Sequence, residues 1–73
     1  IRVNAVSGGP IDTDALKAFT NYEEVKAKTA EYSPLNRIGQ PQDLAQSCYF
    51  LCTSDASWIT GHTLIVDGGT TFR

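Results

Sequence analysis

The chain has 73 residues and a formal net charge of −2, and 41% of its residues are hydrophobic and 19% charged. These proportions are those of a folded globular protein and argue against an intrinsically disordered chain. The six basic residues are mixed with eight acidic ones and form no basic patch, which argues against nucleic acid as a partner. Apolar runs are too short for a membrane span, so we expect no membrane association.

A chain of this length forms one domain at most. A single core of this size contributes only about 3–5 kcal/mol of net stability. The first residue, Ile1, is not a methionine, and an extended pattern begins there with no cap or turn before it. We therefore interpret the chain as the C-terminal fragment of a larger protein.

The first predicted element is a strand. Apolar and polar residues alternate over residues 1–6, which is the periodicity of a strand with two unlike faces. The glycines and the proline of residues 8–10 end this strand. A loop or a short helix is expected to follow over residues 14–19.

A capping-box pattern, Thr20-Asn21-Tyr22-Glu23, precedes the next predicted helix. The Thr20 hydroxyl is expected to accept from the amide three residues on, while Glu23 reaches back to the cap. This helix should run from about residue 21 to 32, because Pro34 excludes helical geometry from the residue before it. Its thin stripe, Val25, Thr29 and Tyr32, leaves two interpretations open. Core packing or one wall of an apolar substrate pocket would explain Leu16, Phe19, Tyr22, Val25 and Tyr32 equally well.

A stronger helix is predicted over residues 41–53. Pro41 suits the first helical position, where its missing N–H is no loss, and Asp43 complements the positive end of the helix dipole. A broad apolar face predicts that this helix packs tightly against something large. That face comprises Leu44, Ala45, Cys48, Tyr49, Leu51 and Cys52.

Cys48 and Cys52 are the only cysteines. On a helix, their spacing places the Cβ atoms about 5–6 Å apart, whereas a relaxed disulfide needs about 3.5–4.5 Å. Too few ligands accompany them for a metal site, so we interpret both as small buried hydrophobic residues. Reduced thiols fit a cytoplasmic protein. Trp58 is predicted to anchor packing, and His62 to lie at a surface or interface rather than to act in catalysis.

The last predicted element is a strand over residues 63–67. Its run Leu64-Ile65-Val66 is typical of a strand covered on both faces. Gly68 and Gly69 then turn the chain toward a short tail. Two strands so far apart in the sequence cannot form a sheet that stands alone, so we expect both to join further strands.

The stretch Ser-Gly-Gly-Pro-Ile-Asp-Thr, residues 7–13, allows two interpretations. A Gly-rich turn at the carboxyl end of a strand is where open α/β sheets bind ligands, and its amides can hold an anion such as a pyrophosphate. The alternative is an ordinary turn in which Thr13 or Asp14 caps the following helix, and spacing alone favours it. Capping and solvation also explain Asp12 and Asp14 better than acid–base chemistry does.

Taken together, the motifs resemble the C-terminal part of the short-chain dehydrogenases/reductases. These motifs are "N-A-V-S-x-G-x-I-x-T", "R-I-G-x-P-x-D-L-A", "S-x-x-S-x-x-T-G" and "L-x-V-D-G-G", in this order. The resemblance covers nearly the whole chain and is weakest over residues 18–33. It implies an α/β fold in which the chain is the C-terminal segment of a Rossmann-like doubly wound parallel sheet, in a tetrameric or dimeric assembly. Residues 1–6 would be the sixth strand.

The resemblance also assigns roles within a single domain. Residues 1–13 would form a strand and a cofactor loop, 14–33 the substrate loop, and 34–73 the last helix and last strand. The cofactor, NADPH or NADH, would contact Gly9, Pro10, Ile11 and Thr13, with backbone bonds from Ile11 to the nicotinamide carboxamide. The substrate would contact Leu16, Phe19 and Tyr22. The family's Gly-rich fingerprint and its Ser, Tyr and Lys have no counterpart in this chain, so we expect no catalytic residue and no metal site here.

Gly8 departs from the pattern of most carbonyl-reducing relatives, which carry proline at this position. The stretch "NAVSGG-x-IDTDALK" is similar to enoyl-[acyl-carrier-protein] reductase III, whereas "RIGQPQDLA" and "WITGHTLIVDGG" look equally like 3-oxoacyl-[acyl-carrier-protein] reductases. The resemblance thus implies a cytoplasmic homotetramer of fatty-acid biosynthesis that reduces an enoyl thioester carried on acyl carrier protein, with 3-oxoacyl reduction as the alternative. A non-catalytic piece that acts only in assembly is the rival interpretation.

Overall fold

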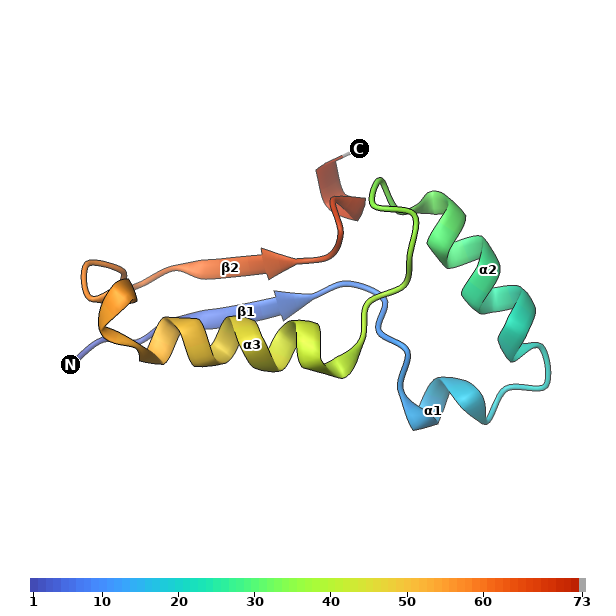
Figure 1. The fold of residues 1–73 in the computed structure, drawn as a ribbon, viewed down its shortest axis with the longest axis horizontal. Helices are drawn as coiled ribbons and strands as arrows, with labels where there is room; N and C mark the ends of the chain where they lie inside the picture. Colours follow the sequence, from blue (N-terminus) through green and yellow to red (C-terminus); the bar gives the residue numbers. More distant parts are fainter. Residues whose placement is uncertain (73) are drawn as a thin grey trace.

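The computed structural model describes residues 1–72 and contains two strands, three α-helices and two short 3₁₀ turns (Figure 1). In chain order the elements are β1 (Ala5–Gly8), α1 (Asp14–Lys17), α2 (Tyr22–Tyr32), α3 (Pro41–Cys52), a 3₁₀ turn (Ser54–Ala56), β2 (Thr63–Val66) and a second 3₁₀ turn (Thr70–Phe72). Helix α3 lies along the two strands, whereas α1 and α2 form an arm that extends beyond their carboxyl ends (Figure 1). We call residues 14–32 the α1–α2 arm.

The two strands are parallel neighbours, although more than fifty residues separate them in the sequence. Ala5 pairs with Thr63, and the register continues to Gly8 opposite Val66. Beyond the strand, the Gly9 amide still donates to the Val66 carbonyl at 3.1 Å. The sequence predicts that each strand joins further strands. It does not predict that the two strands pair with each other. This pairing brings the carboxyl ends of β1 and β2 to one edge.

Strand β1 lies later than the sequence predicts: it runs over Ala5–Gly8 instead of residues 1–6, and Gly8 belongs to it instead of ending it. The reason is that side chains replace part of the backbone ladder before it. The Val3 amide donates to the Thr60 hydroxyl at 3.1 Å, and the side-chain oxygen of Asn4 accepts from the His62 amide at 3.0 Å. Residues 2–4 are therefore extended but irregular.

Helix α3 begins at Pro41, as predicted, and ends at Cys52, one residue earlier than predicted. Pro41 occupies the first helical position, and the carboxylate of Asp43 accepts from the Gln40 amide at 2.7 Å, which caps the helix. The helix ends at Cys52 because Thr53 adopts an extended backbone. At this end the Arg2 guanidinium donates to the Leu51 carbonyl at 3.0 Å. A residue that precedes β1 thus provides the hydrogen-bond donor for one of the last carbonyls of the helix.

Only part of the predicted apolar face of α3 is covered. Leu51 is buried and Leu44 half-buried against the strands. Ala45 is exposed, and so are Cys48, Tyr49 and Cys52. The two cysteines are free thiols, as predicted, but the prediction that they are buried is wrong within the described chain, because no other described segment covers them.

Two other burial predictions fail for the same reason. Trp58 is 98% exposed and anchors no packing among residues 1–72. Strand β2 is covered by α3 on one face only, so Ile65 is exposed while Leu64 and Val66 are half-buried. His62 is exposed, in agreement with its predicted surface position. One helix can cover only one face of a two-stranded sheet.

Helix α2 starts one residue later than the capping-box pattern predicts. Asn21 occupies the N-cap position and makes no side-chain cap hydrogen bond, so the predicted Thr20 cap is wrong. Thr20 is still part of a turn in which the Tyr22 amide donates to the Phe19 carbonyl at 3.3 Å. The predicted end is confirmed, because Ser33, which precedes Pro34, is extended.

The described chain is flat and elongated, with extents of 44 × 26 × 15 Å and a radius of gyration of 14.2 Å. A compact domain of this length would have a radius of gyration of about 11 Å. Among the described residues, the buried hydrophobic ones are Ile38, Leu51 and Ala56, and none of the large side chains is fully buried. The core is therefore small and lies between α3, the strands and the segment that precedes α3.

Candidate cofactor site at the carboxyl end of the strands

Residues 9–13 form a loop that leaves the carboxyl end of β1, and we call it the cofactor loop. A parallel bridge joins Ile11 to Gly39, in the segment that leads into α3. In this bridge the Gly39 amide donates to the Pro10 carbonyl at 3.0 Å, and the Asp12 amide donates to the Gly39 carbonyl at 2.8 Å. The loop is thus fixed by backbone hydrogen bonds on both sides of Ile11.

This bridge leaves the N–H and C=O of Ile11 itself without a partner among residues 1–72. In an extended backbone, the polar groups of consecutive residues point in opposite directions. Pro10 and Asp12 face Gly39, so the Ile11 groups point to the other side. One donor and one acceptor side by side are complementary to a primary amide, which carries a carbonyl acceptor and an NH₂ donor.

Gly9 is required by a close approach of two backbones. A Cβ at Gly9 would lie 2.6 Å from the Cβ of Asp67 and 3.0 Å from its Cα. A Cβ at Gly8 would instead meet the methyl groups of Leu44 at 2.8 and 2.9 Å. The packing of α3 on β1 therefore explains why residue 8 is a glycine, whatever the substrate is.

Thr13 is the N-cap of α1, as the simpler sequence interpretation predicts. Its hydroxyl oxygen accepts from the Leu16 amide at 3.4 Å, and its carbonyl accepts from the Leu16 and Lys17 amides. The hydroxyl is exposed, and its own proton remains available to a ligand. A cap and a ligand contact are therefore compatible at this residue.

Asp12 is buried, which corrects the expectation of a solvated carboxylate. Both of its carboxylate oxygens accept from the Tyr22 hydroxyl, at 2.8 and 2.9 Å, and Lys26 Nζ lies 3.5 Å away. The Tyr22 hydrogen bond, together with the charge of Lys26, holds the pKa of Asp12 below its usual value, and the same bond raises the pKa of Tyr22. Asp14, in contrast, is exposed and pairs with Lys17 at 3.7 Å.

The three predicted substrate residues all lie on the α1–α2 arm, and they differ in exposure. Leu16 is half-buried on α1, and Phe19 is 58% exposed in the turn that follows it. Tyr22 turns its hydroxyl to Asp12. Whether these residues contact a substrate stays a prediction, but the hydrogen bond of Tyr22 gives that residue a separate structural role.

A cavity of about 420 Å³ borders the cofactor loop between α3, the end of β2 and the segment before α3. Pro10 and Ile11 are the predicted site residues that line it. On its other sides lie Arg37, Asp43 and Phe50. Gly9, Thr13 and the predicted substrate residues are outside its lining, so the predicted site is only partly gathered around one cavity.

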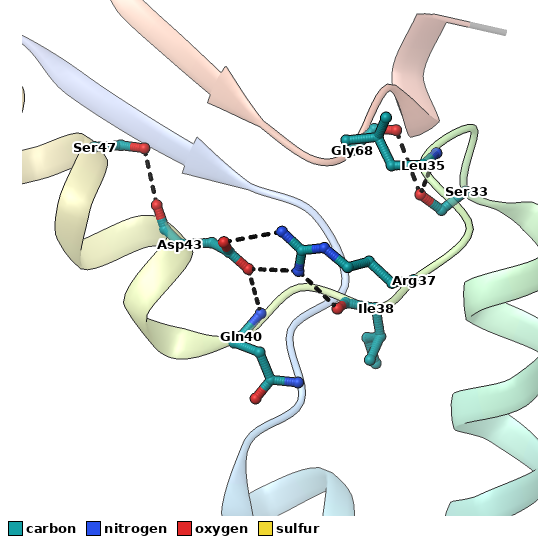
Figure 2. Close-up of polar contacts among 8 residues, drawn as sticks. All are labelled: Ser33, Leu35, Arg37, Ile38, Gln40, Asp43, Ser47 and Gly68. Atoms are coloured by element: carbon teal, nitrogen blue, oxygen red, sulfur yellow. Dashed lines mark hydrogen bonds and ion pairs between the residues drawn. The ribbon is translucent and has the colours of Figure 1, made fainter.

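One wall of this cavity is a polar cluster that the sequence motif "R-I-G-x-P-x-D" contains but that spacing did not assign (Figure 2). Arg37 donates to both carboxylate oxygens of Asp43, at 2.9 and 3.1 Å, and the Ser47 hydroxyl donates to the Asp43 carbonyl at 2.9 Å. The Arg37 hydrogen bond and the Gln40 amide lower the pKa of Asp43 to about 2. The cluster fixes the start of α3 next to the cofactor loop.

The end of β2 is fixed to the same segment (Figure 2). The buried Ser33 hydroxyl donates to the Gly68 carbonyl at 3.3 Å and accepts from the Leu35 amide at 3.3 Å. Gly68 has a φ of +64°, a conformation that glycine adopts without strain. Asp67 accepts from the Thr71 hydroxyl and from the Thr71 and Gly69 amides, which keep its pKa below the usual value.

The described residues offer neither a metal site nor a helix that spans a membrane. Within residues 1–72, no group of three or more His, Cys, Asp and Glu side chains is placed to hold a metal ion. Among the same residues, no helix has the length and apolar character that crossing a membrane requires.

Comparison with known proteins identifies the family. The family model described as "Enoyl-(Acyl carrier protein) reductase" matches residues 1–71. The 7alpha-hydroxysteroid dehydrogenase of Escherichia coli is 46% identical over 69 residues, which cover 94% of this chain and 27% of that protein. The chain belongs to the short-chain dehydrogenase/reductase family. It spans between 27% and 29% of the length of the curated relatives that it matches.

Solved structures of the family confirm the α/β fold class. A short chain dehydrogenase family protein from Francisella tularensis superposes with a TM-score of 0.85 at 33% identity, over all of this chain and 34% of that one. ElxO, solved with NADP bound, superposes with a TM-score of 0.84 at 34% identity, over all of this chain and 30% of that one. The parallel pair β1–β2 with α3 is thus a segment of the Rossmann-like sheet of short-chain dehydrogenases/reductases.

A nicotinamide carboxamide fits the donor and acceptor groups that the cofactor loop presents. The unpartnered N–H and C=O of Ile11 match its carbonyl oxygen and its NH₂ group. The Thr13 hydroxyl, at the exposed start of α1, retains a proton to donate. Pro10 limits the conformations of the loop through its fixed φ. These groups suit the neutral amide end of a dinucleotide and lack the cationic side chains of a dedicated phosphate site.

Proposed function

We propose that the protein of which this chain is a part is an NAD(P)H-dependent oxidoreductase, and that the cofactor loop holds its nicotinamide end. Membership of the short-chain dehydrogenase/reductase family supports the cofactor class. The observation that carries the proposal is the pair of unpartnered polar groups on Ile11, held in place by the bridge to Gly39. When bound, the reduced nicotinamide supplies the hydride for the reaction.

In this proposal, the residues of this chain bind the nicotinamide and orient it. The backbone of Ile11 fixes the rotation of the carboxamide, and the Thr13 hydroxyl adds a third hydrogen bond. Gly9 lets the loop approach Asp67 closely, so the loop stays at the carboxyl edge of the sheet. Orientation of this kind lowers a reaction barrier by fixing the reacting atoms in advance.

For the substrate we propose an enoyl thioester on acyl carrier protein, as the resemblance of "NAVSGG-x-IDTDALK" implies. The description of the matching family model, an enoyl-(acyl carrier protein) reductase, supports this class. Reduction would add a hydride and a proton across the carbon–carbon double bond. The α1–α2 arm, with Leu16, Phe19 and Tyr22, would cover the acyl chain, and the protein would work as a cytoplasmic homotetramer.

A second candidate is the interconversion of a hydroxyl group and a ketone, including 3-oxoacyl reduction. It is favoured by the similarity to the 7alpha-hydroxysteroid dehydrogenase of Escherichia coli, which acts on a hydroxysteroid as its name says. The packing reason found for Gly8 also removes the need to explain that glycine by enoyl reduction.

The test separates the two candidates by the substrate with which the cofactor is oxidised or reduced. The intact protein is incubated with NADH or NADPH and with crotonyl or acetoacetyl thioester, and separately with oxidised cofactor and a 7α-hydroxysteroid. Cofactor absorbance is followed in each case. Enoyl reduction predicts cofactor oxidation with crotonyl thioester above all. A signal only with acetoacetyl thioester or the steroid establishes the second candidate, and no signal with any of them refutes both.

A further inference from the structure

The Asp12 carboxylate is the side chain through which the cofactor loop is tied to α2. Its side chain is only 6% exposed, and it lies between Ile11 and Thr13, the two residues that the proposed function places against the cofactor. The Asp12 amide is held on the other side by the Gly39 carbonyl. Asp12 is thus fixed both through its backbone and through its side chain.

The partners of Asp12 come from one face of α2. Tyr22 and Lys26 are four residues apart, so their side chains lie on the same side of the helix. The Tyr22 hydroxyl reaches both carboxylate oxygens, and Lys26 Nζ lies 3.5 Å from one of them. The Lys26 ammonium also lies 5.7 Å from the centre of the Tyr22 ring, within the range of a cation–π contact.

The energetic reason for this cluster is the cost of a buried charge. A carboxylate removed from water is destabilising unless it is paired and hydrogen-bonded. If α2 moved away, Asp12 would lose both partners and would have to turn toward solvent. Because Ile11 and Thr13 are its chain neighbours, such a turn would displace the groups that face the cofactor.

We propose that Tyr22 and Lys26 are positioning residues that act through Asp12 on the backbone of Ile11 and Thr13. Docking of α2 and binding of the cofactor then stabilise each other, because coupling between two sites is reciprocal. The identity of the cofactor in this proposal rests on the proposed function, whereas the tether between α2 and the loop does not. Tyr22 thereby influences cofactor binding, in addition to any contact that it makes with the substrate.

The experiment uses the intact protein with Tyr22→Phe and Lys26→Met. Matched controls are Tyr49→Phe, an exposed tyrosine on α3, and Lys28→Met, whose partner is the exposed Glu24. Hydrogen exchange is measured without cofactor for peptides covering residues 9–17 and 22–32. Dissociation constants are measured for NADH and NADPH by fluorescence titration.

We expect both variants to accelerate exchange in residues 9–17 as well as in 22–32. We also expect them to raise the cofactor dissociation constant roughly three- to tenfold, the range expected for the loss of one hydrogen bond or ion pair. The two controls should match the wild type in the exchange of both segments and in both dissociation constants. Lys26→Arg, which keeps the charge, should restore most of the affinity.

Two results would overturn the proposal. Faster exchange in residues 22–32 alone, with residues 9–17 and the dissociation constants unchanged, would show that the cluster stabilises only α2. Unchanged exchange in both segments would show that it stabilises neither. If the wild type binds neither NADH nor NADPH, the proposed function fails, and exchange in residues 9–17 by itself decides whether the tether exists.

Discussion

Within the cofactor loop, neighbouring residues have separate physical roles. Gly9 permits contact with Asp67, Ile11 presents two unpartnered backbone groups, and Asp12 reaches α2 through its side chain. Thr13 both caps α1 and exposes a hydroxyl. Because these roles differ, substitutions in adjacent positions should produce different defects, and the first two predictions depend on this difference.

Thr13→Val should weaken cofactor binding several-fold in the intact protein. Valine keeps the shape of the side chain but removes the hydroxyl, which both caps α1 and faces the cofactor in the proposed function. Loss of an N-cap alone costs about 1 kcal/mol of stability. Thr13→Ser, which retains the hydroxyl, is the control for titration of the reduced cofactor. An unchanged dissociation constant in Thr13→Val would reduce the role of Thr13 to helix capping.

Gly9→Ala should destabilise the intact protein more than Gly8→Ala. The added Cβ at Gly9 meets the backbone of Asp67, whereas that at Gly8 meets the mobile end of Leu44. Overpacking of this kind typically costs about 1–3 kcal/mol, with Gly8→Ala expected at or below the lower limit because Leu44 can change rotamer. Urea unfolding of both variants measures the difference. Equal losses would contradict the backbone contact at Gly9.

At the scale of elements, the start of α3 is fixed by an ion pair that the motif "R-I-G-x-P-x-D" encodes. Arg37 and the Gln40 amide both bind the Asp43 carboxylate (Figure 2). Gly39, between them, holds the cofactor loop. The helix start and the loop are therefore stabilised together, although they belong to different elements.

The contribution of Asp43 should depend on pH in a defined direction. Its pKa in the folded chain is about 2, below the value of 3.8 for an unperturbed aspartate. A depressed folded pKa contributes stability that is fully present above the unfolded value and is lost as pH falls toward the folded value. The stability difference between the wild type and Asp43→Asn should be constant from pH 7 to 5 and shrink below about pH 4. A difference that is the same at pH 3 and pH 7 would contradict this assignment.

At the scale of the whole molecule, the described chain has little interior of its own. Ile1, Val3, Trp58 and Ile65 are exposed, and the radius of gyration of 14.2 Å exceeds that of a compact domain of equal length. Apolar faces of this kind mark surfaces that other structure covers. The relatives that the chain matches are more than three times longer, which agrees with this picture.

Residues 1–73 expressed alone should therefore unfold without a cooperative transition. The expected signs are binding of a hydrophobic dye in dilute buffer and a gradual loss of circular dichroism with urea. Addition of NADH or NADPH should leave both measurements unchanged, since the few polar groups of the cofactor loop offer too little contact to stabilise the fold. A sigmoidal transition with coincident spectroscopic probes would show that the small core around Ile38 and Leu51 suffices.

The sequence by itself determined the order and the approximate limits of most elements, because these depend on local rules. Pro41 and Asp43 start α3, Pro34 ends α2, and the apolar run marks β2. The alternation over residues 1–6 overlaps β1 only at Ala5 and Val6. The motif order also identified the family. The cofactor contacts inferred from that resemblance stay predictions, although the free groups of Ile11 are consistent with them.

Only the tertiary structure decided which distant residues meet. The pairing of β1 with β2, the bridge from Ile11 to Gly39 and the burial of Asp12 beneath Tyr22 all join residues through space. The sequence interpretation placed Cys48, Cys52 and Trp58 inside because it assumed complete cover for every apolar residue. Periodicity and caps act over a few residues along the chain, whereas burial and charge pairing depend on what another segment brings to the same point in space.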